Sequence, residues 1–173
     1  MWDFFETVRH RHSVRKYQSD RPVEPEKLHA ILESAVAAPS AGDLQSYHII
    51  VVNDAASRAA LRQAAQDQAF LTSAPVCLVF CCDPERAAER YGERGRTLYA
   101  IQDATIAAAY AQLAVVAAGL GSTWVGNFDA ERIAWTLGLA KGLVPVTLLS
   151  LGYPAELPEP TPRRHLEQMV EYR

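Results

Sequence analysis

The sequence predicts a single domain of the α+β class, in which helices and strands share one core. The chain has 173 residues, of which 49% are apolar and 21% are charged, so it can bury one sizeable core. One set of segments repeats apolar residues at helical spacing. Other segments are apolar or β-branched runs of strand length, such as residues 48–53 and 76–82. We therefore expect the whole chain, residues 1–173, to form one domain.

The charge balance and the N-terminus restrict the partners and the location. The formal net charge is -3 at pH 7, whereas proteins that bind nucleic acid through bulk electrostatics carry an excess of Lys and Arg. Residues 1–6 lack the basic start and apolar run of a signal peptide. No apolar stretch approaches the roughly 20 residues that span a bilayer. We expect a cytoplasmic protein with no nucleic-acid or membrane partner.

The cysteines and histidines do not form the patterns of a disulfide framework or a metal site. Cys77, Cys81 and Cys82 fall in one apolar run, so we expect buried strand residues rather than disulfides or a redox pair. The five histidines have neither H-E-x-x-H spacing nor a cysteine partner at zinc-site spacing: His10, His12, His29, His48 and His165. We therefore expect no structural or catalytic metal.

Local patterns place the elements of the first half of the chain. Residues 3–9 predict a short helix that leads to Arg11. Pro25 suits the first turn of a second helix that ends before Pro39, and apolar residues repeat along it at i, i+3, i+4 and i+7: Leu28, Ile31, Leu32 and Ala35. Residues 48–53 then form a β-branched strand.

The middle of the chain combines a weak helix, a buried strand and a charged segment. Alanine-rich residues 55–65 predict the helix. Residues 76–82 follow Pro75 and are apolar on both faces, which predicts a central strand. Residues 83–96 are charged and contain two glycines, so we expect a mobile surface excursion with some helix.

The last part of the chain begins with a long alanine-rich helix, predicted over residues 98–118. Because it has little polar face, this helix belongs in the middle of the molecule or in a subunit interface. Gly119 and Gly121 end it. Three further elements follow: a strand at 122–125, a helix at 130–137 capped by Asp129, and a strand at 146–153. Prolines then lead out an extended tail: Pro154, Pro158, Pro160 and Pro162.

Four motifs carry the candidate chemistry. In Arg11-His12-Ser13-Val14-Arg15, two guanidiniums and a hydroxyl occupy alternate positions, which share one side of an extended backbone and can grip a phosphate. Taken alone, this is also the pattern of a solvated basic loop. The second motif, Ala38-Pro39-Ser40-Ala41-Gly42-Asp43-Leu44-Gln45, is a polar loop that on its own also suits a helix-ending turn. The others are Trp124-Val125-Gly126-Asn127 and Pro162-Arg163-Arg164.

Together, these motifs resemble the flavin-binding signature of the nitroreductase family. The resemblance runs from end to end and is most specific over residues 1–50, where the Arg-x-Ser-x-Arg, the Ala-Pro-Ser-Ala-Gly and a β run follow in the family's order. It implies a nitroreductase-like fold with a central, mainly antiparallel sheet flanked by helices, and an intertwined homodimer. The tail, whose residues 166–170 regain apolar character, would cross to the other subunit; packing on its own domain is the alternative.

The resemblance also implies that FMN is the cofactor. Arg11 and Ser13 match residues that bind its phosphate and ribityl end. Arg15 matches a residue near the pyrimidine edge, where a positive charge stabilises the reduced flavin. Arg163, in preference to Arg164, would close over the phosphate. The full cofactor-binding set is Arg11, His12, Ser13, Arg15, Pro39, Ser40, Ala41, Gly42, Gln45, Gln68, Val125, Gly126, Asn127 and Arg163.

The remaining roles follow from the same resemblance. The loop of residues 39–45 would reach the flavin held mainly by the other subunit. A backbone N–H near Gly126 or Asn127 would bond flavin N5, and Gln68 would reach the pyrimidine edge. The chain departs from the family pattern where members commonly have Asn, Pro and Trp: Asp43, Ser46 and Tyr47.

The activity that the resemblance implies is that of an FMN-dependent NAD(P)H oxidoreductase with a ping-pong mechanism. NAD(P)H passes hydride to flavin N5 and leaves, and the reduced flavin then delivers electrons to a small acceptor such as a nitroaromatic or a quinone. No side chain is expected to be catalytic, because flavin N5 carries the chemistry. The sequence has no serine nucleophile elbow, P-loop or dinucleotide GxGxxG. The alternatives are a flavin-dependent dehalogenase, a flavin-fragmenting enzyme, or a non-catalytic flavin-binding protein.

Overall fold

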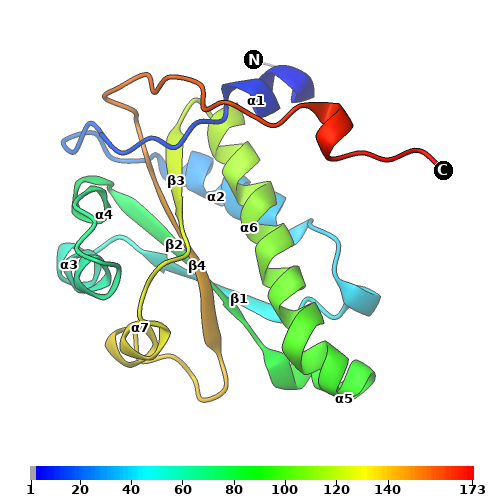
Figure 1. Ribbon diagram of the computed structural model, residues 1–173. Helices are drawn as coiled ribbons and strands as arrows, with labels where there is room; N and C mark the ends of the chain where they lie inside the picture. The colour runs from blue at the N-terminus through cyan, green and yellow to red at the C-terminus, as the bar shows by residue number, and fades with distance from the viewer. Residues whose placement is uncertain (1–2) are drawn as a thin grey trace.

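A four-stranded sheet forms the centre of the computed structural model, which describes residues 3–173 (Figure 1). Met1 and Trp2 lie outside the described residues, although the sequence analysis included them among the residues that lack the features of a signal peptide. The strands are β1 (Tyr47–Val52), β2 (Val76–Cys82), β3 (Gly121–Val125) and β4 (Val144–Gly152), in the order β1-β2-β4-β3. Every neighbouring pair of these strands is antiparallel, so the expected antiparallel sheet is confirmed.

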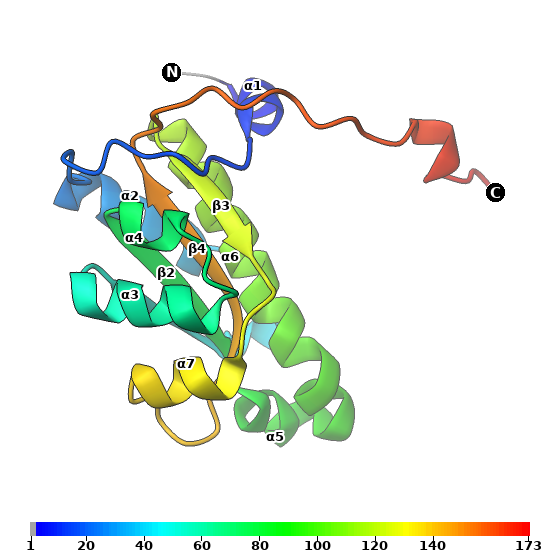
Figure 2. The same ribbon diagram turned by 60° about the vertical axis from the view of Figure 1, so that its left-hand side comes forward.

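Helices cover both faces of the sheet, as Figure 2 shows. One face carries α2 (Pro25–Val36) and α6 (Ala100–Ala117), and the other carries α3 (Ala55–Ala64), α4 (Phe70–Ser73) and α7 (Ala130–Thr136). The short helix α1 (Phe4–His10) contacts α6. The α+β class is therefore confirmed, with one hydrophobic core on each side of the sheet.

Strand β2 is buried along its whole length, as its apolar pattern predicts. Leu78 and Phe80 pack into the core under α2 and α6, whereas Cys77, Val79 and Cys81 pack into the opposite core. All three cysteines are buried and free, which confirms the expected core thiols. Burial raises the pKa of the Cys77 thiol to about 12, so it stays protonated and unreactive at neutral pH.

The alanine-rich helix α6 lies in the middle of the molecule, as expected. The helical stretch from Pro84 to Ala117 is apolar and long enough to cross a membrane by length and composition alone. The face of α6 that lies against the sheet is buried, and Ala104, Ala108, Ala111 and Val115 there are fully buried. The small alanine side chains let the helix approach the strands closely. Ala111 packs in the core of its own chain, so it is not free to contact a second subunit.

Most element boundaries agree with the predicted ones because their caps are local. Asp3 caps α1 in a capping box with Glu6, Pro25 occupies the first turn of α2, and Asp129 accepts the Arg132 N–H at 2.9 Å to cap α7. The short helix α4 was not among the predicted elements.

The segment at residues 83–96 lies largely on the surface, as expected, but it is mostly helix where only some helix was expected. Asp83 caps α5 (Pro84–Arg94), and a π-helical turn, η2 (Gly95–Tyr99), leads directly into α6. The helix is interrupted only at Gly92, near its end. The glycines therefore mark the junction between two helices rather than a loop.

The last part of the C-terminal tail, which includes the apolar residues 166–170, does not pack on its own domain, whereas the first part bonds to residues 15–17. Beyond Pro158 every residue is exposed, and the tail runs along the end of the molecule beside α1 before leading away from it (Figures 1 and 2). The tail contains one short 3₁₀ turn, η3 (Leu166–Gln168). Its apolar side chains are exposed along its whole length: Leu157, Leu166, Met169, Val170 and Tyr172. The alternative of packing on the same chain therefore does not hold.

We predict that α6 does not tolerate a larger side chain at its buried alanines. Ala111→Phe should lower the free energy of unfolding by about 1–3 kcal/mol, because the fully buried site has no room for a ring. Ala59→Phe, at an exposed position of α3, is the control and should change it by less than about 0.5 kcal/mol. Urea unfolding monitored by circular dichroism measures both values, and equal losses would contradict the packing of Ala111 in the core.

Candidate functional site

Residues 11–15 lie along the edge strand β3. Ser13 forms a parallel bridge with Ser122, and the Val14 N–H donates to the Ser122 carbonyl at 3.0 Å. The Thr123 hydroxyl donates to the Val14 carbonyl. Val14 is 5% exposed and packs in the core. Since alternate residues of an extended segment point to opposite sides, the odd-numbered residues point away from the core: Arg11, Ser13 and Arg15. The segment therefore has the extended geometry that the motif requires.

A pocket of about 410 Å³ gathers positive charge at this end of the molecule. Arg9, Arg11, His12 and Arg163 line it, and we call it the cationic pocket. Within residues 3–173, neither Arg11 nor Arg163 forms an ion pair with a carboxylate. Burial and the nearby charge of Arg163 lower the pKa of Arg11. Because Arg11 and Arg163 are close enough to repel each other, a phosphate between them would relieve that repulsion, so the pair is chemically suited to an anion.

The geometry distinguishes between the two arginines of the tail. Arg163 lines the cationic pocket, whereas Arg164 donates to the carbonyl of Gln168 at 2.8 Å within the tail. The sequence analysis did not single out Arg9, whose position next to the motif in α1 was its only signal.

The loop of residues 39–45, named loop 39–45 below, has a strained backbone. Gly42, Asp43 and Gln45 have φ values of 57°, 57° and 48°. This left-handed conformation costs about 1–3 kcal/mol for each non-glycine residue. The positive φ of Gly42 is the conformation that glycine adopts without strain, and a Cβ there would also displace the ends of the Tyr91 and Arg90 side chains. Such a conformation persists only where the surroundings hold it.

Helix α5 supplies part of that support. Arg86 Nε donates to the Leu44 carbonyl at 2.5 Å, and Arg90 Nη1 donates to the Gly42 carbonyl at 3.1 Å. Within the loop, the Gln45 N–H donates to the Ser40 hydroxyl at 3.0 Å. The segment that sequence analysis treated as a loose surface excursion therefore braces loop 39–45.

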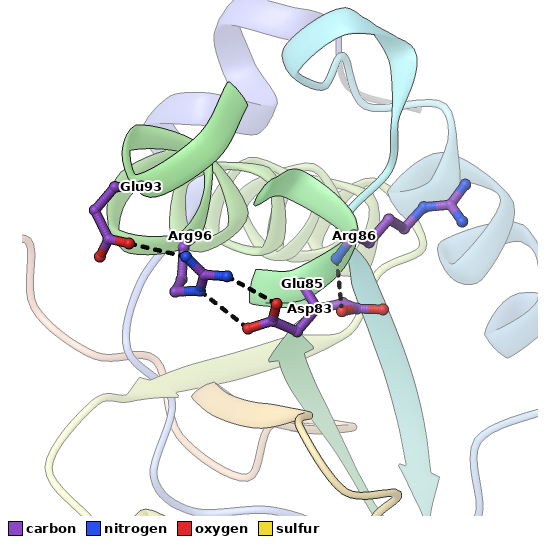
Figure 3. A network of polar contacts seen from close by, with 5 residues as sticks. All are labelled: Asp83, Glu85, Arg86, Glu93 and Arg96. Atoms are coloured by element: carbon purple, nitrogen blue, oxygen red, sulfur yellow. Dashed lines mark hydrogen bonds and ion pairs between the residues drawn. The ribbon is translucent and has the colours of Figure 1, made fainter. Parts of the chain in front are cut away.

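A charged network holds α5 against the turn that follows it (Figure 3). Arg96 in that turn pairs with Glu85 at 2.8 Å and with Glu93 at 2.8 Å. The two carboxylates raise the pKa of Arg96. At the start of the helix, the Asp83 carboxylate accepts the Arg86 N–H at 3.1 Å. These largely exposed contacts add to the packing of Ala87, which is fully buried in the core and holds α5 in the position from which it reaches the loop.

One chain does not bring the cationic pocket and loop 39–45 together. The loop is bonded to Asp103 in the first turn of α6. His12, which lines the cationic pocket, also lines a pocket with Val116 at the last turn of α6. At 1.5 Å per residue, these turns are about 20 Å apart along the helix axis. Figure 1 shows the same separation, with α1 and the tail at one end of α6 and the α2–β1 connection nearer the other.

The other candidate residues lie on or beside the sheet. Val125 is buried at the end of β3, and its carbonyl accepts the Thr147 hydroxyl at 3.0 Å. The next residues, Gly126 and Asn127, are exposed. Gln68 is half-buried between α3 and α4, and Arg15 is exposed with its N–H donating to Glu156 at 2.9 Å. No group of three or more metal-ligating side chains is arranged to hold an ion within residues 3–173.

Comparison with known proteins identifies relatives over nearly the whole chain. A family model described as the nitroreductase family matches residues 8–70 and 66–153. An NADH dehydrogenase from Thermus thermophilus is 37% identical, over 94% of this chain and 92% of the relative. An NADPH-flavin oxidoreductase from Vibrio harveyi is 32% identical, over 91% of this chain and 68% of the relative. The crystal structure of nitroreductase A from Vibrio parahaemolyticus superposes with a TM-score of 0.90 and 31% identity, covering 99% of this chain and 76% of that one.

We predict that Arg163, and not Arg164, contributes to anion binding. Arg163→Gln should weaken the binding of inorganic phosphate about tenfold or more, because a charge-assisted contact contributes about 1.5–3 kcal/mol. Arg164→Gln removes the same charge one residue away and should bind phosphate like the parent. The phosphate dependence of the thermal unfolding midpoint measures both affinities. Equal losses in the two variants would show that only the net charge of the tail matters.

Proposed function

The chain belongs to the nitroreductase family, and we propose that it holds FMN with its phosphate in the cationic pocket and passes electrons from NADH or NADPH to a small acceptor. It is an FMN-dependent NAD(P)H oxidoreductase, in line with the activities for which its relatives are named. The observation that supports the FMN site is that Arg11 and Arg163 line one pocket and, within residues 3–173, neither forms an ion pair with a carboxylate. We propose that the whole chain forms one flavin-binding domain and works in the cytoplasm.

The residues present fit a flavin that carries a terminal phosphate. A phosphate monoester bears up to two negative charges near neutral pH, which the guanidiniums of Arg11 and Arg163 can balance, with Arg9 on the same pocket. Ser13 points to the same side of the segment as Arg11 and supplies a hydroxyl for the phosphate or the ribityl chain. We assign the phosphate to Arg11, His12 and Arg163 on this basis.

The chain's task in the reaction is to bind FMN and to tune its reduction potential. When bound, FMN supplies N5 as the hydride-accepting atom, so a nicotinamide donor and a nitroaromatic or quinone acceptor can use one site in turn. Arg15 would place a fixed positive charge by the pyrimidine edge, where negative charge develops on reduction. The exposed backbone after β3, at Gly126 and Asn127, would offer an N–H to N5.

A second copy of the chain would complete the site. Loop 39–45 lies about 20 Å from the cationic pocket along α6, so the loop of one chain would serve the flavin held by the other. A groove of about 480 Å³ runs between α1, α2 and α6 and is lined largely by apolar residues, including Phe4, Tyr110 and Leu113. The exposed apolar tail gives the second copy something to bury. We therefore propose a homodimer in which the tails are exchanged.

The function is tested by the spectrum of the purified protein. We expect a yellow protein with about one FMN per chain, whose flavin absorbance bleaches when NADH or NADPH is added without oxygen. A flavin that neither nicotinamide reduces would contradict the oxidoreductase, and a colourless protein that takes up no FMN would contradict the cofactor assignment.

We predict that Arg15 tunes the redox step. Arg15→Gln should keep FMN bound but lower its two-electron potential by roughly 20–65 mV, since about 1–3 kcal/mol of stabilisation of the reduced state is lost. Hydride transfer from NAD(P)H should slow accordingly.

Lys16→Gln is the matched control, because Lys16 is the next residue along, is exposed and pairs with Glu156 at 3.7 Å. Dye equilibration gives the potentials, and anaerobic stopped flow gives the rates. If both variants keep the parent's potential and rate at saturating FMN, Arg15 is an ordinary surface charge.

A further inference from the structure

We propose that Asp103 is a positioning residue, whose buried carboxylate holds loop 39–45 in the shape that the loop presents to the flavin. This inference rests on the proposed FMN-dependent function and adds to it a residue that no family motif singled out. Asp103 lies in the first turn of α6 and acts through the loop's backbone.

The carboxylate connects the two ends of the loop. One oxygen, Oδ1, accepts the Ala41 N–H at 2.9 Å, and the other, Oδ2, accepts the Ser46 N–H at 3.2 Å. Asp103 is 2% exposed. A hydrogen bond to an ionised acceptor is about twice as strong as a neutral one, so this pair fixes the loop firmly.

A buried carboxylate does little to stabilise the hydrophobic core against which α6 packs. Within residues 3–173, Asp103 forms no ion pair with a lysine, arginine or histidine. A buried charge without a counterion loses hydration that hydrogen bonds replace only in part. An apolar residue would suit the surrounding helix better, so what Asp103 contributes is the shape of the loop.

The strained residues of the loop lie between the two points that Asp103 holds. Gly42, Asp43 and Gln45 all adopt left-handed conformations there, and two of them are not glycine. Such strain is retained where neighbouring structure over-determines the backbone, and it concentrates at functional sites. Together with Arg86 and Arg90 from α5, Asp103 supplies that constraint from the helix side.

The residue at position 46 fits this role. The Ser46 hydroxyl is buried without a hydrogen-bond partner, whereas its backbone N–H is bonded to Asp103. The side chain therefore gains nothing from its hydroxyl, and the backbone N–H is what Ser46 contributes. Proline, the residue common in the family at this position, has no N–H and would leave Oδ2 of Asp103 unpaired.

The test measures FMN and phosphate binding separately in Asp103→Asn. The asparagine has the same shape but one acceptor oxygen, so its NH₂ group faces one of the two backbone N–H groups. We expect the Kd for FMN to rise about tenfold and the visible circular dichroism of saturated FMN to change. The affinity for inorganic phosphate should stay at the parent value, because the cationic pocket lies at the other end of α6. Asp20→Asn, an exposed site with the same chemical change, is the control and should behave like the parent.

Ser46→Pro tests the same contact from the loop side without altering α6. It removes the Oδ2 bond alone, and we expect a smaller rise in the Kd for FMN together with the same change in circular dichroism. If both variants lose folding stability but bind FMN with the parent's Kd and spectrum, Asp103 is merely structural and the proposal is wrong. If the parent itself binds no FMN, the proposed function fails and this inference with it. If the parent binds FMN and both variants bind it as the parent does, the inference about Asp103 is wrong while the proposed function stands.

Discussion

Helix α6 sets the distance between the two regions that the sequence motifs mark for the cofactor. Its first turn holds loop 39–45 through Asp103, and its last turn adjoins the segment that carries Arg11 and His12. The helix is packed into the core by fully buried alanines, so it cannot bend to bring its ends together. The separation of about 20 Å is therefore a fixed property of one chain, and a second chain is the direct way to unite the two regions.

The support of loop 39–45 shows how the core serves this arrangement. The loop is strained, and its carbonyls and N–H groups are held from two helices that continue into each other: Arg86 and Arg90 on α5, and Asp103 on α6. The burial of Ala87 in the core positions α5, and the exposed pairing of Arg96 with Glu85 and Glu93 adds to it. Rigid placement of a loop in this way reduces the ordering needed when a ligand binds. At the opposite end, the cationic pocket depends on the tail, which contributes Arg163 but is exposed beyond it.

The sequence predicted what local patterns control. The cap Asp129, the proline at the start of α2 and the two-sided apolar run of β2 each specify an element without help from distant residues. The family motifs led to the cationic pocket. What could not be predicted depends on contacts between distant segments. The charged segment that forms α5 contains glycines, so its sequence resembles that of a loop, and the contacts of Asp83 and Arg96 that support it as a helix are visible only in the structure. Asp103 lies in an alanine-rich helix, and nothing in its local sequence indicates that it bonds to Ala41 and Ser46.

Mixed dimers test most directly whether two chains share each flavin site. One variant would carry Arg11→Gln and Arg163→Gln, which disable the cationic pocket, and the other Gly42→Val, which disrupts loop 39–45. Each variant alone should bind FMN weakly. If the site is shared, a dimer with one chain of each kind contains one site with both regions intact, so it should bind about one FMN with the parent's affinity. Mixed dimers that bind no FMN at the parent's affinity would contradict the account, because sites built within single chains would all be defective.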